Sequence, residues 1–484
     1  MRIQSQITSI ADMKVAFTAQ QQASRSELPP SYAFRIEQLK CLQSILLDNQ
    51  QQFAQAMYDD YSGRSLIDTR LGDLLPTANA IKHNIKHLKK WMRPRKQKLV
   101  YYVKPSSGFV LSQPLGVVGV MAPWNFPIQL LLIPLASAIA AGNRVMIKPS
   151  ELTPNTTELM ASLIAEKFDP LWLNVVSGGS DIGAAFVELA FDHLFFTGST
   201  NVGHLVMQAA AKNLTPVTLE LGGKSPLIIH REYPLSLAAK RIAMGKLFNA
   251  GQVCVAPDYI LTPKDLIPAL VEELKTAIAV YAPTLRDNID YTAIINERHL
   301  LRLQHLIDDA RSHNAEILEI NPAAESLTGT RKIAPHLLWQ VNDDMAIMQE
   351  EIFGPLLPIV GYDIIADAIA YVNARPRPLA LYYFDNNKKR QAKLLSSTIA
   401  GGVAINTIMM QIAQENLPFG GIGPSGMGAY HGETGFRTFS HEMSVFVQSR
   451  FAYADFLQRP MKPWFNKIWP YMIGRTNAAK KQAK

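Results

Sequence analysis

Two short strings in this chain contain residues that could perform covalent chemistry. Glu220 begins Glu-Leu-Gly-Gly-Lys, and Cys254 ends Gly-Gln-Val-Cys. A cysteine attacks as its thiolate, and small neighbours leave a substrate room to approach. A carboxylate beside two glycines has space for a water molecule and can act as a general base. A lone cysteine is more often a small buried residue, and a lone glutamate a solvated one, so neither residue decides the matter alone.

Five further strings have the order and spacing of one enzyme family. They are Pro123–Pro127, Lys148–Glu151, Phe196–Thr200, Glu351–Pro355 and Asn416–Gly421. Together with the first two strings, they resemble the NAD(P)-dependent aldehyde dehydrogenases over nearly the whole chain. The ending Tyr430–Phe436, followed by Thr438–His441, resembles the class 3 branch and, within it, the bacterial coniferyl aldehyde dehydrogenases.

The resemblance implies a role for each matching residue. Cys254 is the expected nucleophile, Glu220 is the expected base for hydrolysis, and the Asn125 side-chain amide is an expected oxyanion donor with the backbone N–H of Cys254. The expected cofactor is NAD, with NADP possible, and no metal site is expected. The residues expected to bind the cofactor are Trp124, Lys148, Ser150, Glu151, Gly198, Ser199, Gly203, Leu221, Gly222, Glu351 and Phe353. Within this set, Glu351 resembles the residue that holds the nicotinamide ribose, and Phe353 resembles its packing neighbour.

Short β-type runs alternate with helical ones from Gly116 onward, which predicts a parallel sheet covered by helices. The predicted strands are Val117–Met121, Arg144–Lys148, Leu173–Ser177 and His193–Thr197, and the predicted helices are Pro127–Ala140, Thr156–Phe168, Ile182–Leu189 and Val202–Ala211. The preceding hundred residues are predicted to be helical, most clearly Arg35–Met57.

Ligands of such sheets bind at the carboxyl ends of the strands. Lys148 and Glu151 follow the second predicted strand, and Ser199 and Thr200 follow the fourth and open a helix. Free N–H groups at a helix start attract phosphate oxygens, and the Glu151 carboxylate could accept hydrogen bonds from a ribose diol. The alternative for these residues is a helix cap with a surface ion pair.

A G-x-G-x-x-G string at Gly421, Gly423 and Gly426 is rejected as a dinucleotide fingerprint. It comes late in the chain, and no βαβ unit contains it. The family resemblance implies instead a loop near the substrate.

Similarity to the family also implies three parts. A Rossmann-like NAD(P)-binding domain is expected in residues 1–96 and 114–221, and an α/β catalytic domain in residues 222–407. A small β oligomerisation arm with the C-terminal tail is expected in residues 97–113 and 408–484. The expected fold class is therefore α/β, with an aldehyde dehydrogenase-like architecture.

The composition fits a large cytoplasmic enzyme. With 484 residues, 48% of them hydrophobic, the chain can bury the cores of two or three domains. Two cysteines, Cys41 and Cys254, are too few for a disulfide framework and fit a reducing compartment. Cys41 lies in an apolar helical pattern and is expected in the core. Residues 1–20 contain no continuous hydrophobic region, so no signal peptide is expected.

The net charge of +8 is concentrated in two stretches. Residues 81–98 contain eight Lys/Arg and no acid, and residues 449–484 contain eight Lys/Arg and one Asp. A nucleic-acid groove is one interpretation of the first stretch. However, Trp91 is its only aromatic residue, and no nucleic-acid motif accompanies it. We therefore expect a solvated helix face and no nucleic-acid partner.

The C-terminal stretch interleaves aromatic with basic side chains. These are Phe451, Tyr453, Phe456, Trp464, Phe465, Trp469 and Tyr471, with Arg459, Lys462, Lys467 and Arg475. This composition suits either a docked C-terminal arm or a segment in weak contact with a membrane surface. The docked arm is favoured, and the resemblance implies a homodimer.

The expected reaction is the oxidation of a small-molecule aldehyde to a carboxylic acid through a thioester on Cys254. One alternative transfers the acyl group to coenzyme A, and another is a non-catalytic binding or structural descendant of the fold. Joint retention of Cys254, Glu220 and Asn125 argues against the non-catalytic alternative. The sequence does not decide which aldehyde is the substrate. A phenylpropenal such as coniferaldehyde fits the resembled branch, and a medium-chain alkanal fits an apolar tunnel with Met409 and Met410 near its mouth.

Overall fold

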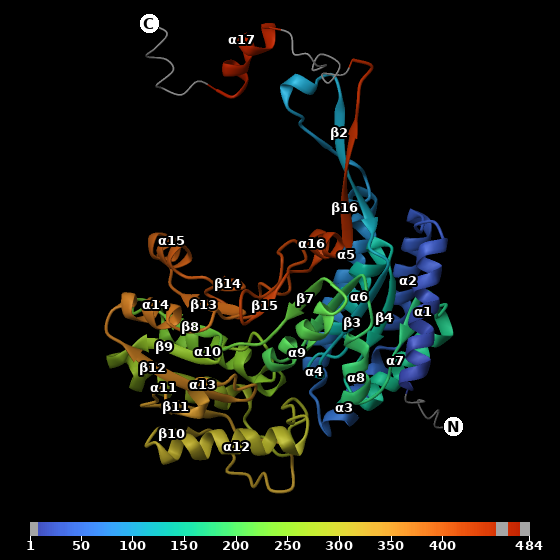
Figure 1. Cartoon of the computed structure of the whole chain (residues 1–484). Coiled ribbons are helices and arrows are strands. Elements are labelled where there is room, and N and C mark those ends of the chain that lie inside the picture. The colour runs from blue at the N-terminus through green and yellow to red at the C-terminus, as the bar shows by residue number, and fades with distance from the viewer. Residues whose placement is uncertain (1–7, 452–462, 475–484) are drawn as a thin grey trace, which may run out of the picture. The chain divides into compact units, whose positions relative to one another are not determined.

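The computed structural model describes residues 8–451 and 463–474. The chain forms two compact units. The first contains the described residues up to Trp91 together with Gln113–His441, and the second contains Met92–Ser112 together with the described residues from Glu442 onward. The first unit holds two largely parallel sheets with helices packed on them (Figure 1). The predicted α/β class is confirmed.

The first sheet has five parallel strands and one short antiparallel edge strand. In spatial order they are β5 (Leu173–Val175), β4 (Arg144–Lys148), β3 (Val117–Met121), β6 (His193–Thr197), β7 (Val217–Glu220) and the antiparallel β15 (Gly426–Met427). The connecting helices are α6 (Gln129–Ala141), α7 (Pro154–Lys167), α8 (Ser180–Val187) and α9 (Thr200–Ala211). The predicted alternation of strands and helices is therefore observed in this part of the chain.

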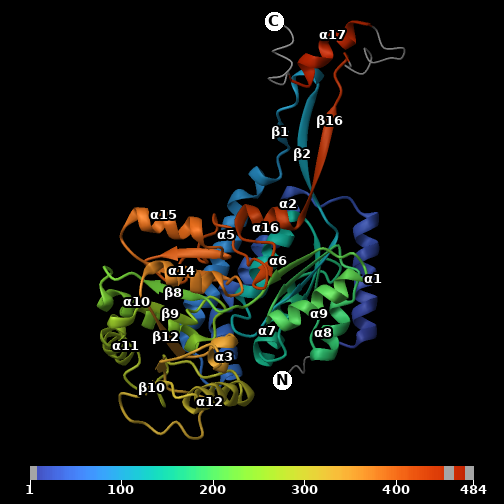
Figure 2. The ribbon, with the colours of Figure 1, turned by 60° about the vertical axis from the view of Figure 1, so that its left-hand side comes forward.

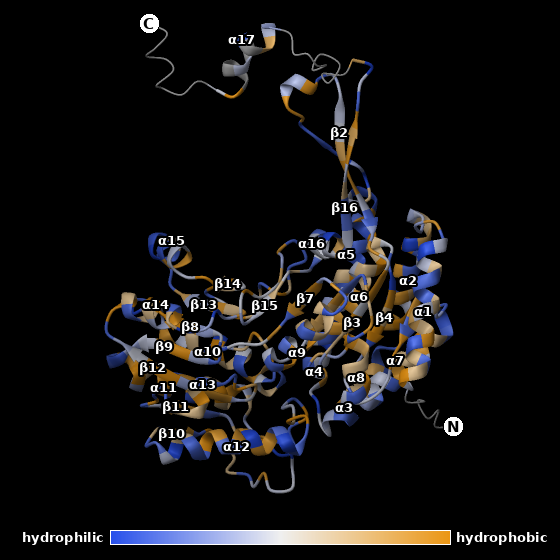
Figure 3. Cartoon of the chain, in the orientation of Figure 1, coloured by the Kyte–Doolittle hydropathy of each residue, from blue (hydrophilic) through white to orange (hydrophobic). Residues whose placement is uncertain are grey.

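Both faces of this sheet are covered, which explains its nearly continuous apolar strands. Val117 and Met146 face the core that includes α1 (Ile10–Ser26), α8 and α9. Side chains alternate between the two faces, and the intervening Val118 and Val145 are equally buried. Every residue of α6 is buried. In Figure 3, β3 and β4 are accordingly coloured as hydrophobic.

The second sheet has seven strands, of which only the edge strand β10 is antiparallel. In spatial order they are β10 (Glu316–Glu319), β11 (His336–Trp339), β12 (Leu356–Tyr362), β9 (Tyr259–Pro263), β8 (Pro226–Ile229), β13 (Ala380–Phe384) and β14 (Gly402–Ile405). The core on one face includes residues of α12 (Glu297–Ser312), α13 (Ala346–Gln349), α14 (Ile365–Asn373) and α15 (Lys388–Ser397). The helices α10 (Leu235–Leu247) and α11 (Ile267–Tyr281) pack against each other beside β9 and β12 in both views (Figure 1, Figure 2).

The N-terminal helices differ from the expectation at one point. The predicted helix Arg35–Met57 is wrong as a single element, because α2 (Tyr32–Asp48) ends at Asn49 and α3 (Gln50–Tyr61) starts after it. Asn49 has non-helical φ and ψ of −117° and 22°, and its side-chain amide donates to the Ile45 carbonyl at 2.9 Å. A side chain that bonds to the local backbone competes with the helix ladder. The chain continues through α4 (Leu66–Thr69), the π-helix η1 (Arg70–Leu74) and α5 (Leu75–Trp91).

Cys41 lies in α2 and is half-buried rather than fully in the core. Its thiol lies 3.7 Å from the Lys167 carbonyl oxygen. Burial raises the pKa of this thiol above its usual value. The residue is therefore a weakly nucleophilic structural cysteine.

The second unit contains a three-stranded sheet, in the order β1 (Arg95–Gln97), β2 (Ser107–Pro114) and β16 (Ser440–Val447), with the turn η2 (Tyr101–Val103). This unit contains fewer residues of the C-terminal part than the expected arm. Residues 408–441 lie in the first unit, where β15 pairs with β7.

The described part of the tail contains one helix, α17 (Pro463–Met472). Tyr453, Phe456, Arg459, Lys462 and Arg475 lie outside the described residues, as does the side chain of Tyr471. In the described part of the chain, no helix has the length and apolar character that crossing a membrane requires.

Candidate active site

Cys254 lies on the loop between the turn η3 (Phe248–Gly251) and β9. Asn249 and Ala250 have left-handed backbone conformations with φ near 50°. Gly251 has φ of 75°, and an added Cβ would lie 2.4 Å from the Gly354 carbonyl oxygen. Only glycine tolerates this approach, so Gly251 is needed to shape the loop that presents the cysteine.

Buried amide side chains hold this loop in place. The Gln252 side-chain nitrogen donates to the carbonyls of Asn249 at 3.0 Å and Ala293 at 3.1 Å, and its oxygen accepts from the Ile295 N–H at 3.0 Å. The Asn249 backbone N–H donates to the Asp68 carboxylate at 3.1 Å. A loop whose polar groups are paired in this way presents its nucleophile in one geometry.

Asn125 follows β3 and reaches the same loop. Its side-chain nitrogen donates to the Gln252 carbonyl at 3.2 Å. Its own carbonyl accepts from Arg64 at 2.7 Å, and Arg64 forms a fully buried ion pair with Asp73 at 2.9 Å. Asp73 in turn accepts from the first N–H groups of the segment entering α6, at Ile128 and Gln129. The Asn125 amide is thus fixed beside the cysteine loop, where an oxyanion donor is required.

Glu220 is the last residue of β7 and is 3% exposed. Within the described residues, neither of its carboxylate oxygens has a hydrogen-bond partner. Burial raises the pKa of this carboxyl well above its usual value. A carboxylate with a raised pKa is a stronger base, and its free oxygens are available to a water molecule. The Gly426 backbone of β15 pairs directly with Glu220, so the glycine string 421–426 lies beside the expected base.

The Cys254 thiol is electrostatically coupled to two carboxyl groups. Burial, followed by the nearby carboxylates of Glu351 and Glu220, raises the pKa of the Cys254 thiol to about 12. The backbone N–H groups of Cys254 and Val255 act in the opposite direction. The three expected catalytic residues, Cys254, Glu220 and Asn125, therefore lie in one buried locality.

The carboxyl edge of the first sheet carries the residues expected to bind the adenosine side of a cofactor. The Lys148 ammonium, at the end of β4, lies 3.4 Å from the Glu151 carboxylate, which is half-exposed. Ser150 accepts from the Leu152 N–H at 3.2 Å. Ser199 caps α9 by accepting from the Val202 N–H at 3.4 Å, directly after Gly198. The helix cap and ion pair anticipated as an alternative are thus present, and they leave the Glu151 carboxylate open to a diol.

The Glu351 carboxylate lies directly over the backbone after β7. An added Cβ on Gly222 would lie 2.0 Å from one of its oxygens, and its other oxygen has no partner among the described residues. Burial, followed by the charge of Asp258, raises the pKa of this carboxyl to about 8. A buried carboxyl with a free oxygen fits the hydroxyl groups of a ribose. Glycine is required at position 222, because any side chain would displace this carboxyl.

Two further contacts shape this part of the edge. Trp124 and Phe353 pack edge to face with ring centroids 5.4 Å apart. An added Cβ on Gly203 would lie 2.6 Å from a Leu221 methyl group, so glycine lets α9 approach the segment after β7. The expected cofactor residues between Trp124 and Gly222 therefore lie at or after the carboxyl ends of strands of the first sheet, and Glu351 and Phe353 contact two of them, Gly222 and Trp124.

An apolar cavity of about 320 Å³ leads to Cys254. Its outer lining includes the exposed side chains of Ile67, Leu71 and Met410. Buried residues line the inner part, namely Phe126, Gln129, Val253, Phe419, Tyr430 and His431, and the partly buried Phe248 lines it as well. Met409 also lines it, so both methionines of the expected tunnel contribute. A cavity of this size and character suits a small apolar or aromatic aldehyde.

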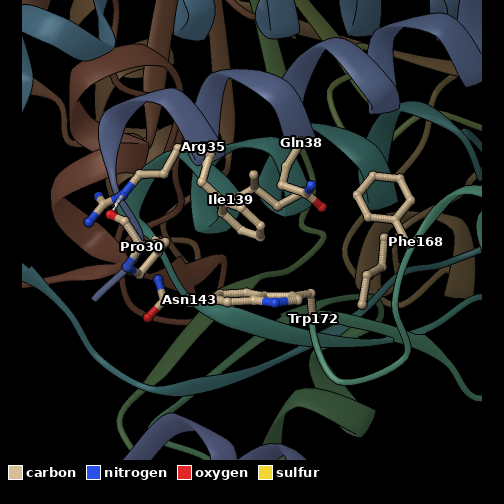
Figure 4. A pocket seen from close by; sticks show the side chains of 10 residues that line it. Pro30, Arg35, Gln38, Ile139, Asn143, Phe168 and Trp172 are labelled. Carbon is tan, nitrogen blue, oxygen red and sulfur yellow. Dashed lines mark hydrogen bonds between the residues drawn. The ribbon is translucent and has the colours of Figure 1, made fainter. Parts of the chain in front are cut away.

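Another recess lies at the amino ends of the strands of the first sheet. Figure 4 shows its lining, in which the Trp172 ring lies opposite Ile139 and Arg35. It has a volume of about 10 Å³, which is room for roughly one water molecule. It is therefore too small for a substrate.

Several residues that organise the site could not be recognised from the sequence. They are Arg64, Asp68, Asp73, Asn249 and Gln252. Asn249 and Gln252 lie five and two residues before Cys254, and this closeness to the cysteine was the only feature of the sequence that could have drawn attention to them. Arg64 lies between α3 and α4, Asp68 lies in α4 and Asp73 lies in η1. All three are more than 100 residues before Cys254, and no local pattern marked them.

Comparisons with known proteins agree over nearly the whole chain. The model of the aldehyde dehydrogenase family matches residues 4–445. The chain is 47% identical over 471 residues to the probable coniferyl aldehyde dehydrogenase of Caulobacter vibrioides, covering 96% of this chain and 97% of that protein. It is 47% identical over 423 residues to the coniferyl aldehyde dehydrogenase of a Pseudomonas species, covering 87% and 88%. The solved substrate-bound state of Staphylococcus aureus AldH has a TM-score of 0.89 at 37% identity, covering 95% of this chain and 98% of that one.

Proposed function

The chain belongs to the aldehyde dehydrogenase family, and from this premise we propose how its own residues carry out the reaction. The resemblance inferred from the seven strings is confirmed. The enzyme oxidises an aldehyde and uses NAD(P). The proposal for the chemistry rests on one observation above all, namely that an unpartnered buried carboxyl, Glu220, is coupled to the thiol of Cys254.

After its thiol has lost its proton, the Cys254 thiolate forms a bond from sulfur to the aldehyde carbon, and the electron pair of the C=O π bond moves to the oxygen, which becomes an oxyanion. The Asn125 side-chain amide has two N–H groups, of which one bonds Gln252 and the other is available to this oxyanion. The backbone N–H of Cys254 is the second donor. When bound, NAD(P) supplies the acceptor for the hydride that leaves the aldehyde carbon, and a thioester on Cys254 results.

Glu220 takes a proton from a water molecule, whose oxygen attacks the thioester carbon and displaces the thiolate. The products are the carboxylic acid and free Cys254. Because water attacks a thioester slowly without a base, the position of Glu220 favours hydrolysis over transfer to coenzyme A. Glu351 would accept hydrogen bonds from the hydroxyl groups of the nicotinamide ribose, and Phe353 would pack beside that ribose, which would keep the reacting atoms in a productive geometry.

The cofactor proposal extends to the adenosine side. Lys148 and Glu151 would hold the adenosine ribose, and the N–H groups at the start of α9 near Ser199 would hold the pyrophosphate. The Glu151 carboxylate repels a 2′-phosphate and favours the free diol, so NAD is the proposed main cofactor.

The proposed substrate is a phenylpropenal such as coniferaldehyde. Three relatives at 47% identity are named coniferyl aldehyde dehydrogenase or probable coniferyl aldehyde dehydrogenase, and the aromatic side chains of Phe126, Phe248 and Phe419 line the cavity. A medium-chain alkanal is the second candidate, because Met409 and Met410 line the same cavity. Measuring kcat/KM for coniferaldehyde and for alkanals of six to ten carbons decides between them. A higher value for the alkanals would reject the phenylpropenal.

We further propose a homodimer joined through the second unit. In this unit Tyr101, Phe446 and Phe451 expose much of their apolar surface. Truncation after Gln448 should dissociate the dimer or lower the melting temperature, as measured by light scattering and thermal unfolding. The membrane-surface alternative predicts salt-sensitive co-sedimentation with anionic vesicles that the same truncation abolishes.

A further inference from the structure

His431 is a polar exception in the inner part of the cavity that leads to Cys254. The residue is 2% exposed and lines this cavity just before α16 (Gly432–Thr438). Its ring interacts with the Gln414 backbone, but within the described residues no hydrogen bond of normal geometry joins either ring nitrogen to a partner. Buried polar groups nearly always form well-made hydrogen bonds, so an imidazole on a cavity wall that lacks one is an available ligand contact.

The imidazole ring is held between two aromatic side chains. It stacks on Phe419 with centroids 5.5 Å apart and an interplanar angle of 20°, and it meets Tyr430 edge to face at 4.5 Å. Its backbone has φ of 85°, which is unusual for a residue with a side chain. Such a conformation persists only where the surroundings determine it, and this commonly occurs at ligand-binding positions.

The backbone after His431 permits little adjustment. Gly432 has φ of 47°, and an added Cβ there would lie 2.2 Å from the Glu415 carbonyl oxygen and 3.2 Å from a His83 ring nitrogen. The backbone beside His431 is therefore closely packed, and Phe419 and Tyr430 contact the ring itself. A ring held in place by its neighbours loses little entropy when a ligand binds.

The character of the ring restricts the matching ligand group. Burial lowers the pKa of His431 to about 4, so the ring is neutral near pH 7 and offers one donor and one acceptor. A neutral ring does not attract an anion selectively. A hydroxyl group, which both donates and accepts, is the complementary partner.

The shape of the cavity indicates which molecule carries that hydroxyl. Phe126 and Phe248 form a near-parallel aromatic pair on its wall, with centroids 6.0 Å apart and an angle of 16°. Flat aromatic walls favour a flat aromatic ligand. A plain alkanal would fill the space but would leave His431 unpaired.

We propose that His431 is a specificity-determining residue that hydrogen-bonds a ring hydroxyl of the aldehyde, so that hydroxylated aromatic aldehydes are the preferred substrate class. The inference rests on the proposed function, because it places the aldehyde carbonyl at Cys254 and the remainder of the molecule in this cavity. A site that pairs a substrate hydroxyl discriminates against the analogue without it, since the buried partner is then left unpaired.

The experiment measures kcat/KM for 4-hydroxycinnamaldehyde and cinnamaldehyde with the parent and with His431→Phe. We expect the parent to prefer the hydroxylated aldehyde by roughly 10- to 100-fold, and the variant to lose most of that ratio. His431→Asn keeps a donor and an acceptor and tolerates the left-handed backbone, so it should retain part of the preference. His305→Phe, an exposed position on α12, is the matched control and should keep the parent ratio.

A second measurement needs no variant and covers the case in which His431→Phe fails to fold. In the parent, 4-propylphenol should inhibit oxidation of hexanal more strongly than propylbenzene does. Equal inhibition, or an unchanged substrate ratio in His431→Phe, overturns the role of His431. Absence of NADH or NADPH formation with every aldehyde would instead overturn the proposed function itself, so the two failures are distinguishable.

Discussion

The side-chain amide of Asn125 donates to the backbone carbonyl of Gln252, two residues before Cys254, at 3.2 Å. This bond joins the segment after β3 to the loop before β9. It places the expected oxyanion donor beside the expected nucleophile. A donor held in position by such a bond needs little reorganisation when the oxyanion forms, which is the main source of its effect on rate.

The assignment of the nucleophile is tested by exchanging each cysteine. Cys254→Ala should lower dehydrogenase turnover by at least about 1000-fold, because no other thiol reaches the cavity. Cys41→Ala should leave turnover nearly intact, since Cys41 lies in α2 against α7. Steady-state NADH formation is the measurement. Substantial turnover by Cys254→Ala would contradict the mechanism.

Replacing Glu220→Gln keeps the shape of the side chain and removes the base. Hydride transfer should survive better than hydrolysis, so stopped-flow traces should show a burst of NADH close to one per active site. Steady-state turnover should then be slower by roughly 10²- to 10⁴-fold. Glu188→Gln, at an exposed position, is the control. Turnover of Glu220→Gln close to that of the parent would show that another group is the base, and acyl-coenzyme A as the main product of the parent would overturn hydrolysis.

The pH dependence of hydrolysis should follow the Glu220 carboxyl. Burial raises its pKa well above 4.5, and only the deprotonated form accepts a proton from water. We therefore expect kcat to rise with pH through a midpoint above 4.5, where hydrolysis limits the rate. In Glu220→Gln this rising limb should vanish from kcat, whereas the burst rate, which depends on the Cys254 thiolate, should still rise with pH. An identical kcat profile in both proteins would argue against this assignment.

The raised pKa of Glu351 should make the folded protein less stable as the pH rises from 4.5 towards 8. Its pKa in the folded protein is raised to about 8, from an ordinary value of 4.5. Below pH 4.5 the carboxyl is neutral in both states, so no stability is lost. As the pH rises towards 8, the unfolded chain releases this proton while the folded protein retains it, so folding becomes less favourable.

Glu351→Gln cannot ionise and should avoid that loss. At each pH, the free energy of unfolding of the parent is subtracted from that of Glu351→Gln. This difference should be more favourable to the variant at pH 8 than at pH 5, by about 1 kcal/mol or more. Urea unfolding at the two pH values measures the difference, without cofactor. If the difference between variant and parent were the same at pH 5 and pH 8, Glu351 would be ionised in the folded enzyme.

Cofactor preference should depend on Glu151. The parent should show a higher kcat/KM with NAD than with NADP, because the half-exposed carboxylate repels a 2′-phosphate. Glu151→Gln should shift the ratio towards NADP by roughly threefold to tenfold, a modest change because solvent screens the charge. Glu166→Gln, on the exposed side of α7, is the control. A parent value for NADP at least equal to that for NAD would refute the preference.

Much of this fold is encoded in short-range patterns of the chain. The strand and helix positions between Val117 and Ala211 follow from local hydrophobic periodicity, because a buried parallel strand and its covering helix each have their own repeat. The expected nucleophile and the expected base were identified through the family resemblance of their strings. Each string also contains a glycine that the local structure needs, because Gly251 adopts a positive φ and Gly222 lies against the Glu351 carboxyl. Requirements of this kind remain visible in a few neighbouring residues.

Contacts between distant segments were decided by the folded structure. The break at Asn49 depends on one side-chain bond that periodicity does not register. The pairing of β15 with β7 moves residues 408–441 out of the expected arm and brings Gly426 beside Glu220. The position of the His431 ring on the cavity wall depends on its contacts with Phe419 and Tyr430, which form only in the folded chain. Burial and hydrogen-bond pairing depend on residues that meet only after folding, so the spacing of residues along the chain could not reveal them.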